Sequence, residues 1–327
     1  IDDMWHATLN TRGEMFSARS PDEVAGAIEA VLSTIAAQTT PVGVSANSTR
    51  LDAGSLVFQS SGNSADWSGD VRAFEPGETV ADWTATEALP DAVDRNIYTW
   101  DPSINAGVPF DIGVSGDVRS RILADVPADF LGNVFPDPAN IVIDYVRGSQ
   151  AFEDPGPLRE RQKLIGDIVN SVPVYVGQRN EGWARIDSGY NDYLDNVKSN
   201  RPETLYVGAN AGMMHAFDAE TGRELFAFVP ASVHKNLPDL VDPDYNHEFY
   251  VDGQFAVSDA QGPSGWTSAL VGTLGAGGRG VFALDIGEPD AFNPAADVLW
   301  EFTSDDDPDI GFTFGDPVIS RLENGTW

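Results

Sequence analysis

The four histidines are the first candidates for metal binding or acid–base chemistry. They lie far apart, at His6, His215, His234 and His247, and no two have the HxH or HExxH spacing of a zinc site. His215 stands inside an apolar run that predicts a strand, so we expect it to be packed and not catalytic. The chain has no Gly-x-Ser-x-Gly elbow and no Walker loop. The sequence therefore predicts no catalytic, cofactor-binding or metal residues.

Acidic residues at alternate positions are a second candidate, because such runs begin calcium loops. Two runs have this pattern: Asp305, Asp307 and Asp309, and Asp242, Asp244 and Asn246. In the first run Gly311 comes one place late, and no acid stands where the bidentate ligand is required. The second run lacks the glycine. We expect both runs to form solvated turns.

Two further runs could bind a phosphate or another anion. Gly275–Gly280 (GAGGRG) is glycine-rich, but it joins two expected strands and does not open a helix, which argues against a dinucleotide cradle. Arg159–Lys163 is the one dense basic patch, and we expect it to pair locally with the abundant carboxylates. Neither run therefore predicts a binding site.

The composition excludes several classes of protein. The chain has 51 acidic and 19 basic residues, a net charge of −32, which repels nucleic acid and anionic lipid. It has no cysteine and hence no disulfide or thiol chemistry. No window approaches the ~18 apolar residues of a membrane span. The 32 glycines, 21 prolines and 42% hydrophobic residues favour a loop-rich β-protein with a core.

The expected strands form a repeated meander. Three of them occupy Leu205–Val207, Met214–Phe217 and Leu225–Phe228, with glycine-containing turns between them. A second set follows the same order, at Ser268–Val271, Val281–Asp285 and Val298–Phe302. Repeated meanders of short strands are typical of β-propeller blades. Two blades and the start of a third cannot close a ring, so we expect an open propeller within a longer protein.

The first half is less regular. Ser20, Pro21 and Glu23 begin a capped amphipathic helix, and Thr40–Ser48 is interpreted as a linker. The other expected elements are a hairpin over Leu51–Phe74, a short helix and strand ending at Trp100, a mostly irregular Asp101–Asp137 with one helical turn near Ala128–Leu131, and a helix at Ala139–Val146. The predicted architecture is mainly β, an open modified propeller of antiparallel blades with long insertions, preceded by a short α-helical segment. The predicted domains are residues 1–39, 40–160 (the β-rich start of the propeller module) and 161–327 (the blades, truncated before ring closure).

Several motifs in order resemble the PilC/PilY family of type IV pilus proteins. They are Asp3–Ala7, Asp66–Gly69, Gly166–Gly177, Tyr206–Asn210, Met214–Asp218, Tyr250–Gly253, Gly272–Asp285, Gly315–Val318 and Asn324–Trp327. The resemblance covers nearly the whole chain and is weakest from Glu75 to Phe152.

The resemblance implies a non-enzymatic, exported factor of type IV pilus biogenesis and twitching motility. Such a protein counters pilus retraction and is a tip-associated adhesin, located at the pilus tip, cell surface or outer membrane. Its implied partners are minor pilins and host or abiotic surfaces. Residues 1–39 would form the end of a von Willebrand A-like domain. The metal-ion adhesion motif of such domains, Asp-x-Ser-x-Ser, is absent from this sequence, because Asp101–Asn105 departs from it at the last position. Ca²⁺ is implied for the full-length parent, in a loop beyond Trp327, with no cofactor in this chain.

Two alternatives stay open. Ala216–Gly222 is similar to the blade motif of quinoprotein (PQQ-type) dehydrogenases, but Phe226 stands where their docking tryptophan would be. The other alternative is a structural surface protein that binds glycan or matrix. In the preferred hypothesis, the propeller is a rigid platform whose insertions, Trp183–Asn200 and Leu237–Tyr250, provide the contact surfaces.

Overall fold

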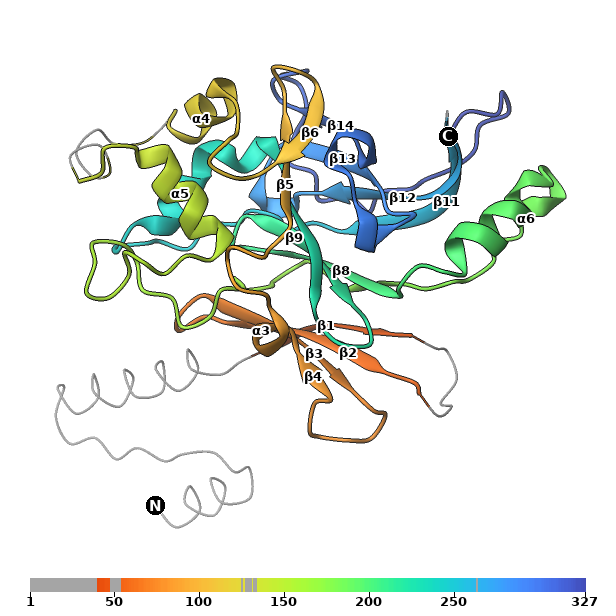
Figure 1. Cartoon of the computed structure of the whole chain (residues 1–327), viewed down its shortest axis with the longest axis horizontal. Coiled ribbons are helices and arrows are strands. Elements are labelled where there is room, and N and C mark those ends of the chain that lie inside the picture. The colour runs from red at the N-terminus through yellow and green to blue at the C-terminus, as the bar shows by residue number, and fades with distance from the viewer. Residues whose placement is uncertain (1–39, 48–53, 125, 127–130, 132–133, 263) are drawn as a thin grey trace, which may run out of the picture.

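The computed structural model describes residues 40–47, 54–124, 126, 131, 134–262 and 264–327. These residues form three β-sheets with short helices around them, and the sheets do not close into a barrel within this part of the chain (Figure 1). The expected helical domain at residues 1–39 and most of the expected helical turn near Ala128–Leu131 lie outside the described residues. The mainly-β, open architecture predicted from the sequence is confirmed.

The first sheet has four strands in the order β1-β2-β3-β4: β1 (Thr40–Ala46), β2 (Val57–Asn63), β3 (Ser68–Phe74) and β4 (Trp83–Thr84). The predicted hairpin is confirmed as β2 and β3. The linker predicted at Thr40–Ser48 is wrong, because β1 pairs antiparallel with β2. Thr40, Val42 and Val44 alternate as in a strand, but Pro41 and Gly43 between them are rare in strands and weaken this signal. The pairing itself satisfies backbone groups that any sequence has.

The second sheet has six strands in the order β6-β5-β10-β9-β8-β7: β5 (Ile97–Asp101), β6 (Ala106–Pro109), β7 (Val174–Val176), β8 (Thr204–Ala209), β9 (Met213–Asp218) and β10 (Glu224–Val229). The predicted strands of the first blade are confirmed as β8, β9 and β10. Strand β5 pairs parallel to β10. Strands from both sides of the predicted boundary at residue 160 therefore share one sheet, and that division stays a prediction.

The third sheet is a four-stranded meander in the order β11-β12-β13-β14: β11 (Phe255–Gly262), β12 (Gly265–Thr273), β13 (Gly280–Asp285) and β14 (Val298–Thr303). The predicted strands of the second blade are confirmed as β12, β13 and β14. The glycine-rich run joins β12 to β13, as predicted, through a single 3-10 turn at Gly275–Gly277.

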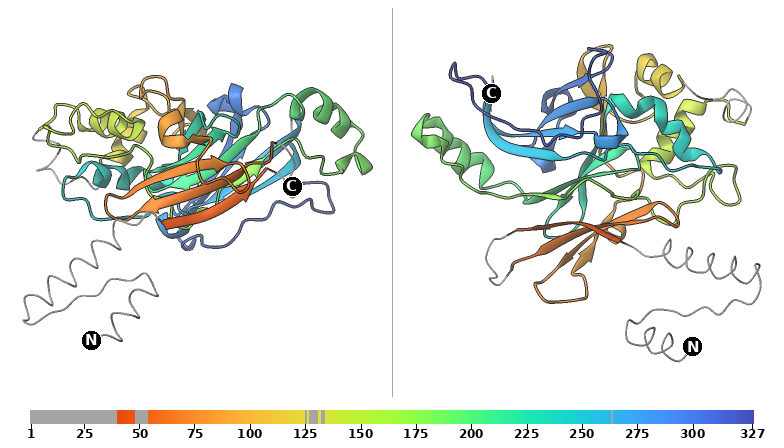
Figure 2. Two further views of the ribbon diagram at one scale, coloured as in Figure 1. Left: turned by 90° about the horizontal axis from the view of Figure 1, so that it is seen from below. Right: turned by 180° about the vertical axis from the view of Figure 1, so that it is seen from behind.

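Three of the α-helices lie at two ends of the molecule. Helices α4 (Gly116–Ile122) and α5 (Pro138–Arg147) lie at one end and α6 (Gly189–Tyr193) at the other, in both Figure 1 and Figure 2. The other short helices are α3 (Ala85–Ala88), α7 (Pro294–Asp297), and the 3-10 helices at Trp183–Arg185, Ala231–Val241 and Pro289–Ala291. No helix in the described ranges is long and apolar enough to cross a membrane.

Local signals explain α5, which the sequence predicted. The Asp137 side chain accepts a hydrogen bond from the Asn140 N–H, Pro138 occupies the first turn, and Gly148 ends the helix at φ 110°. The prediction that Asp101–Asp137 is mostly irregular is wrong in part, because it contains β6 and α4. Strand β6 forms through a tight turn after β5, and α4 is held by buried Val118 and Ile122.

Two hydrophobic clusters hold the sheets together. The larger contains side chains from the second and third sheets, α4, α5 and the 3-10 helix at Ala231–Val241. The smaller joins the first two sheets through Phe58, Val71 and Trp83 on one side and Leu205 and Phe217 on the other. The insertion between β7 and β8 is attached differently, through polar groups.

Candidate functional site

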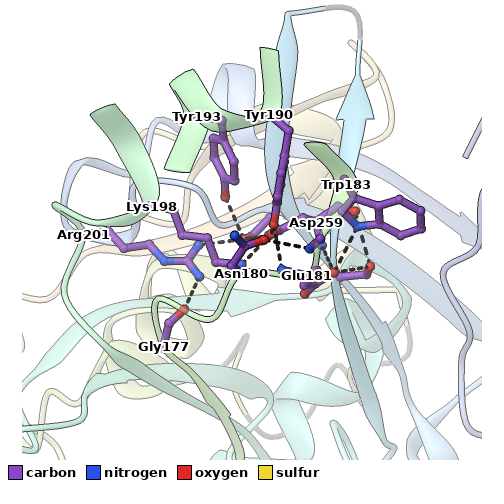
Figure 3. Close-up of polar contacts among 12 residues, drawn as sticks. Gly177, Asn180, Glu181, Trp183, Tyr190, Tyr193, Lys198, Arg201 and Asp259 are labelled. Carbon is purple, nitrogen blue, oxygen red and sulfur yellow. Dashed lines mark hydrogen bonds and ion pairs between the residues drawn. The ribbon is translucent and has the colours of Figure 1, made fainter. Parts of the chain in front are cut away.

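Residues 178–201 form an insertion that leaves the second sheet after β7, lies beside the third sheet and returns into β8. It contains a 3-10 turn, α6 and a π-helical turn at Leu194–Lys198. Tyr190 and Tyr193 are three residues apart and therefore project from the same side of the helix. Figure 3 shows that these tyrosines point toward Asp259 of β11. The insertion therefore packs against the third sheet.

The carboxylate of Asp259 is the centre of the contact. It is fully buried, and its Oδ2 accepts hydrogen bonds from Lys198 Nζ and Tyr190 Oη, each at 2.5 Å. Its Oδ1 accepts from Ser268 Oγ at 2.6 Å. A buried carboxylate is tolerated only with a counter-charge and donors to its lone pairs, and all of these are present here. Two of the three donors come from the insertion (Figure 3).

Arg201 and Tyr193 make a second set of contacts with the same sheet. Ser268 Oγ lies 2.7 Å from Arg201 Nη1, which donates to it, and 2.8 Å from Tyr193 Oη. Arg201 Nη2 also donates to the Gly177 carbonyl oxygen at 2.8 Å, where the insertion begins. The guanidinium therefore joins both ends of the insertion to β12.

The start of the insertion is attached through Glu181. Its Oε2 accepts from the Asp259 N–H at 3.1 Å, from Ser258 Oγ at 3.0 Å and from Trp183 Nε1 at 3.3 Å. The Glu181 N–H in turn donates to Tyr190 Oη at 3.0 Å. These bonds tie the insertion to β11 at a third point (Figure 3).

The cluster of side chains around Asp259 has a structural role and presents no free reactive group. Burial and the hydrogen bond to Asp259 raise the pKa of Tyr190 well above its ordinary value of 10, and burial does the same for the pKa of Tyr193. Both phenols therefore stay protonated and act as donors. Because Lys198 and Asp259 neutralise each other at contact distance, the pair positions the insertion.

The outer face of the insertion is open to solvent. Its exposed side chains are mostly amide, acidic or hydroxyl groups, with two arginines and one apolar residue that is 52% exposed: Gln178, Arg179, Asn180, Arg185, Ile186, Ser188, Asn191, Asp192, Asp195, Asn196, Ser199 and Asn200. The insertion therefore presents a polar surface of defined shape on the side away from β11.

The second predicted insertion, Leu237–Tyr250, is largely packed into the molecule. Leu237, Val241 and Tyr250 are fully buried, and the Tyr250 hydroxyl donates to the Asn236 carbonyl oxygen at 2.9 Å. Its exposed part is the turn at residues 242–246, where Asp242 Oδ1 accepts from the Asp244 N–H. This acidic run is thus a solvated turn, as predicted.

Three histidines lie in separate surroundings, and His6 is outside the described residues. His215 is buried in β9, as predicted, with Nδ1 2.7 Å from Glu224 Oε1. His234 is buried, and burial lowers its pKa to about 3. His247 Nε2 lies 2.8 Å from Asp167 Oδ2. Across the described residues, no three histidine or acidic side chains are close enough together to share a metal ion.

The acidic run after β14 also forms a turn. Asp305 pairs with Arg121 at 2.7 Å, and Asp307 Oδ1 accepts from the Asp309 N–H at 2.9 Å. All three aspartates of the run are exposed. The prediction that this chain holds no calcium remains a prediction.

The basic patch pairs locally, as predicted. Arg161 contacts Glu153 at 2.6 Å, and Lys163 contacts Asp70 at 3.1 Å. The sequence did not reveal the pairing of Lys198 with Asp259, which are 61 positions apart. Asp259 lies in the middle of β11, a strand that was not predicted from the sequence, and a buried charged side chain there requires a partner.

The chain is similar in sequence to known pilus proteins. Residues 165–327 match the family described as the PilY1 beta-propeller domain. The chain is 35% identical to the type IV pilus biogenesis factor PilY1 of Pseudomonas aeruginosa strain UCBPP-PA14, over all of this chain and 30% of that protein. It is 36% identical to a PilY1 homolog of Xylella fastidiosa strain Temecula1, over 87% of this chain and 22% of that protein.

A solved structure is also similar in sequence. The chain is 37% identical to the crystal structure of the Pseudomonas aeruginosa PilY1 C-terminal domain, over 47% of this chain and 30% of that one, with a TM-score of 0.38. The chain thus spans less than a third of the length of these relatives.

Proposed function

Since this chain belongs to the PilY1 family, we propose that it is the propeller segment of a type IV pilus biogenesis factor. The observation that carries the proposal is the 35% identity to a named pilus biogenesis factor along the whole chain. The protein acts without catalysis, as a binding and assembly component that is exported and associated with the pilus. Phe226 stands where a quinoprotein dehydrogenase would have its docking tryptophan. It is fully buried and stacks on Phe292 with ring centroids 4.1 Å apart, so its ring is not available to a quinone, and this supports a role without catalysis.

The propeller segment is a rigid platform in this proposal, and the insertion at residues 178–201 is a contact surface. The support is the contrast between the two faces of the insertion. The inner face is fixed by the buried Lys198–Asp259 pair, whereas the outer face is exposed. A surface that is already ordered before binding loses little conformational entropy when a partner binds.

The partners that we propose are minor pilins at the pilus tip and the surfaces to which cells attach. Through the first contact the protein supports pilus extension against retraction, and through the second it acts as a tip adhesin in attachment and twitching. Ca²⁺ belongs to the full-length protein in this proposal, outside residues 1–327.

A count of surface pili tests the pilus role. Electron microscopy of cells lacking the parent gene should show few or no pili, and additional loss of the retraction motor should restore them. Pilus numbers that are unchanged by the first deletion would overturn the proposal. An absorbance band of a bound quinone in the purified protein would instead favour a dehydrogenase.

A second experiment tests the contact surface itself. Replacing the exposed Asp192, Asp195 and Asn196 by lysine makes the outer face strongly positive and leaves the buried pair in place. We expect reduced piliation or attachment with an unchanged amount of folded protein. A matched control makes the same change at Asp290 and Glu323, which are exposed elsewhere. Equal effects of the two sets would place the contact surface elsewhere.

A further inference from the structure

A cleft of about 620 Å³ lies where the loop between β12 and β13 meets α4 and the 3-10 helix at Ala231–Val241. Its walls come from α4, the 3-10 helix at Ala231–Val241, the segment 247–249, the turn before β13 and the chain that follows β14. Ligand clefts in proteins have volumes of about 300–1,000 Å³, so the space is large enough for a sugar or a short oligomer.

The charge of this cleft differs from that of the whole chain. The chain has a net charge of −32, but three cations line the cleft, Arg121, Lys235 and Arg279, against two acids, Glu248 and Asp305. Fields at a protein surface are screened within about 8 Å at physiological salt, so charges close to the cleft affect its ligand more than distant ones do. The nearby acids outside the lining include Asp117, which pairs with Arg121 at 3.0 Å, and the exposed Asp307 and Asp309.

Two of the cations are not neutralised by a carboxylate at contact distance. Arg279 donates through Nε to the Ile310 carbonyl oxygen and through Nη2 to that of Pro308, both at 2.7 Å. These neutral acceptors fix its position and leave its charge unbalanced. Lys235 is exposed and makes no hydrogen bond or ion pair with any described residue.

The other two lysines of the chain are each paired with a carboxylate. Lys163 contacts Asp70 at 3.1 Å, and Lys198 contacts Asp259 at 2.5 Å. Arg121, the third cation of the cleft, is itself paired with Asp305 at 2.7 Å. Among the described residues Lys235 is therefore the one lysine without an ion pair, and it lines the same cleft as Arg279.

Neutral groups of the cleft suit a hydroxyl-rich ligand with an apolar face. Phe312 is 57% exposed and lines the cleft with the half-buried Phe249. Ser232 is fixed beside them, because the buried Glu301 accepts from its N–H at 2.9 Å and from its Oγ at 2.6 Å. Aromatic rings with a few placed polar groups are typical of ligand clefts.

We propose that this cleft binds an acidic polysaccharide, with the carboxylate of a uronate residue held by Lys235 and Arg279 and its ring against Phe312. The proposal deepens the attachment role proposed above and rests on it. A uronate chain carries one carboxylate per sugar, which matches a cleft that contains separate cations, aromatic faces and hydroxyl or amide groups.

Direct binding tests this proposal, with a galacturonate hexamer as the probe and the intact protein in a calorimeter at low salt. We expect saturable binding that weakens as salt is added. Lys235→Glu should weaken binding by about tenfold or more, and Lys235→Gln by less. The matched control is Arg223→Glu, which reverses an exposed cation that does not line the cleft and should leave binding unchanged.

Four outcomes would overturn the proposal. They are no binding to the unmodified protein at millimolar probe, equal binding of a neutral galactose hexamer, equal or tighter binding of a glutamate hexapeptide, and equal loss in Arg223→Glu and Lys235→Glu. Melting curves of Lys235→Glu and Arg223→Glu show whether each variant folds. If Lys235→Glu does not fold, binding is measured with Lys235→Gln in its place. Counting pili on cells that carry Lys235→Glu distinguishes this proposal from the proposed pilus role. Normal pili together with lost binding would show that the cleft acts in ligand binding and not in pilus formation.

Discussion

Two buried ion pairs occupy different regions of this molecule and hold different parts of it in place. In the second sheet, Arg95 contacts Glu224 through Nε at 2.6 Å and Nη2 at 2.8 Å, and both side chains are 1% exposed. Beside the third sheet, Lys198 contacts Asp259 at 2.5 Å, with side chains 3% and 1% exposed. Both pairs join segments that are far apart in the sequence.

The pairs differ in what would move if they were broken. Arg95 lies just before β5 and Glu224 begins β10, so the first pair fixes the parallel pairing of two strands within the core. Arg95 also donates to the Arg147 carbonyl oxygen at the end of α5. The second pair fixes an insertion whose outer face is in solvent. A buried pair of opposite charges thus stabilises a whole sheet in one region of this molecule and holds only a surface insertion in the other.

The largest expected effect is the loss of the core pair. Arg95→Met leaves Glu224 buried without its cation, which should lower the free energy of unfolding by about 4 kcal/mol. Denaturant titration measures this loss. The double variant Arg95→Met, Glu224→Leu should recover much of it, because no unpaired charge then remains. A single variant as stable as the parent would contradict the role given to this pair.

Acid should weaken the same region next. Burial raises the pKa of Glu224, but the charge and hydrogen bonds of Arg95 and His215 outweigh burial and lower the pKa to about 2, below its ordinary value of 4.5. Its contribution of about 3 kcal/mol is therefore present above pH 4.5 and is lost as the pH falls toward 2. Stability measured from pH 5 to pH 3 should fall less in Glu224→Gln, and equal slopes would argue against this linkage.

Loss of the peripheral pair should have a smaller and local effect. Lys198→Met leaves Asp259 with the donors Tyr190 and Ser268, so we expect a loss of about 2 kcal/mol. Hydrogen exchange should become faster in residues 178–201 and stay unchanged in β8 to β10. The control is Lys163→Met, whose pair with Asp70 is partly exposed and contributes less than about 1 kcal/mol. Faster exchange throughout the second sheet would show that the two regions are not separate.

The smallest expected effect concerns a single hydroxyl. Tyr190→Phe removes the donor to Asp259 and the acceptor of the Glu181 N–H, and it keeps the aromatic ring. We expect a loss of about 1 kcal/mol, again seen as faster exchange within residues 178–201. An effect larger than that of Lys198→Met would mean that the tyrosine, and not the ion pair, holds the insertion.

The sequence by itself determined the local elements and the class of fold. Apolar runs between glycine turns predicted β8, β9, β10 and the strands β12, β13 and β14, and Asp137, Pro138 and Gly148 determined the ends of α5. These signals are local, because a turn, a cap or an alternating strand depends on residues only a few positions apart. The charge of −32 was likewise evident from composition alone.

The tertiary structure decided everything that depends on long-range pairing. Strand β1 exists because β2 offers it backbone partners, and β5 joins β10 across about 130 positions. Lys198 meets Asp259, and Lys235 and Arg279 come to line one cleft, only after the chain has folded. An isolated charge in a sequence does not reveal its partner, because opposite charges attract according to their distance in space and not their separation along the chain.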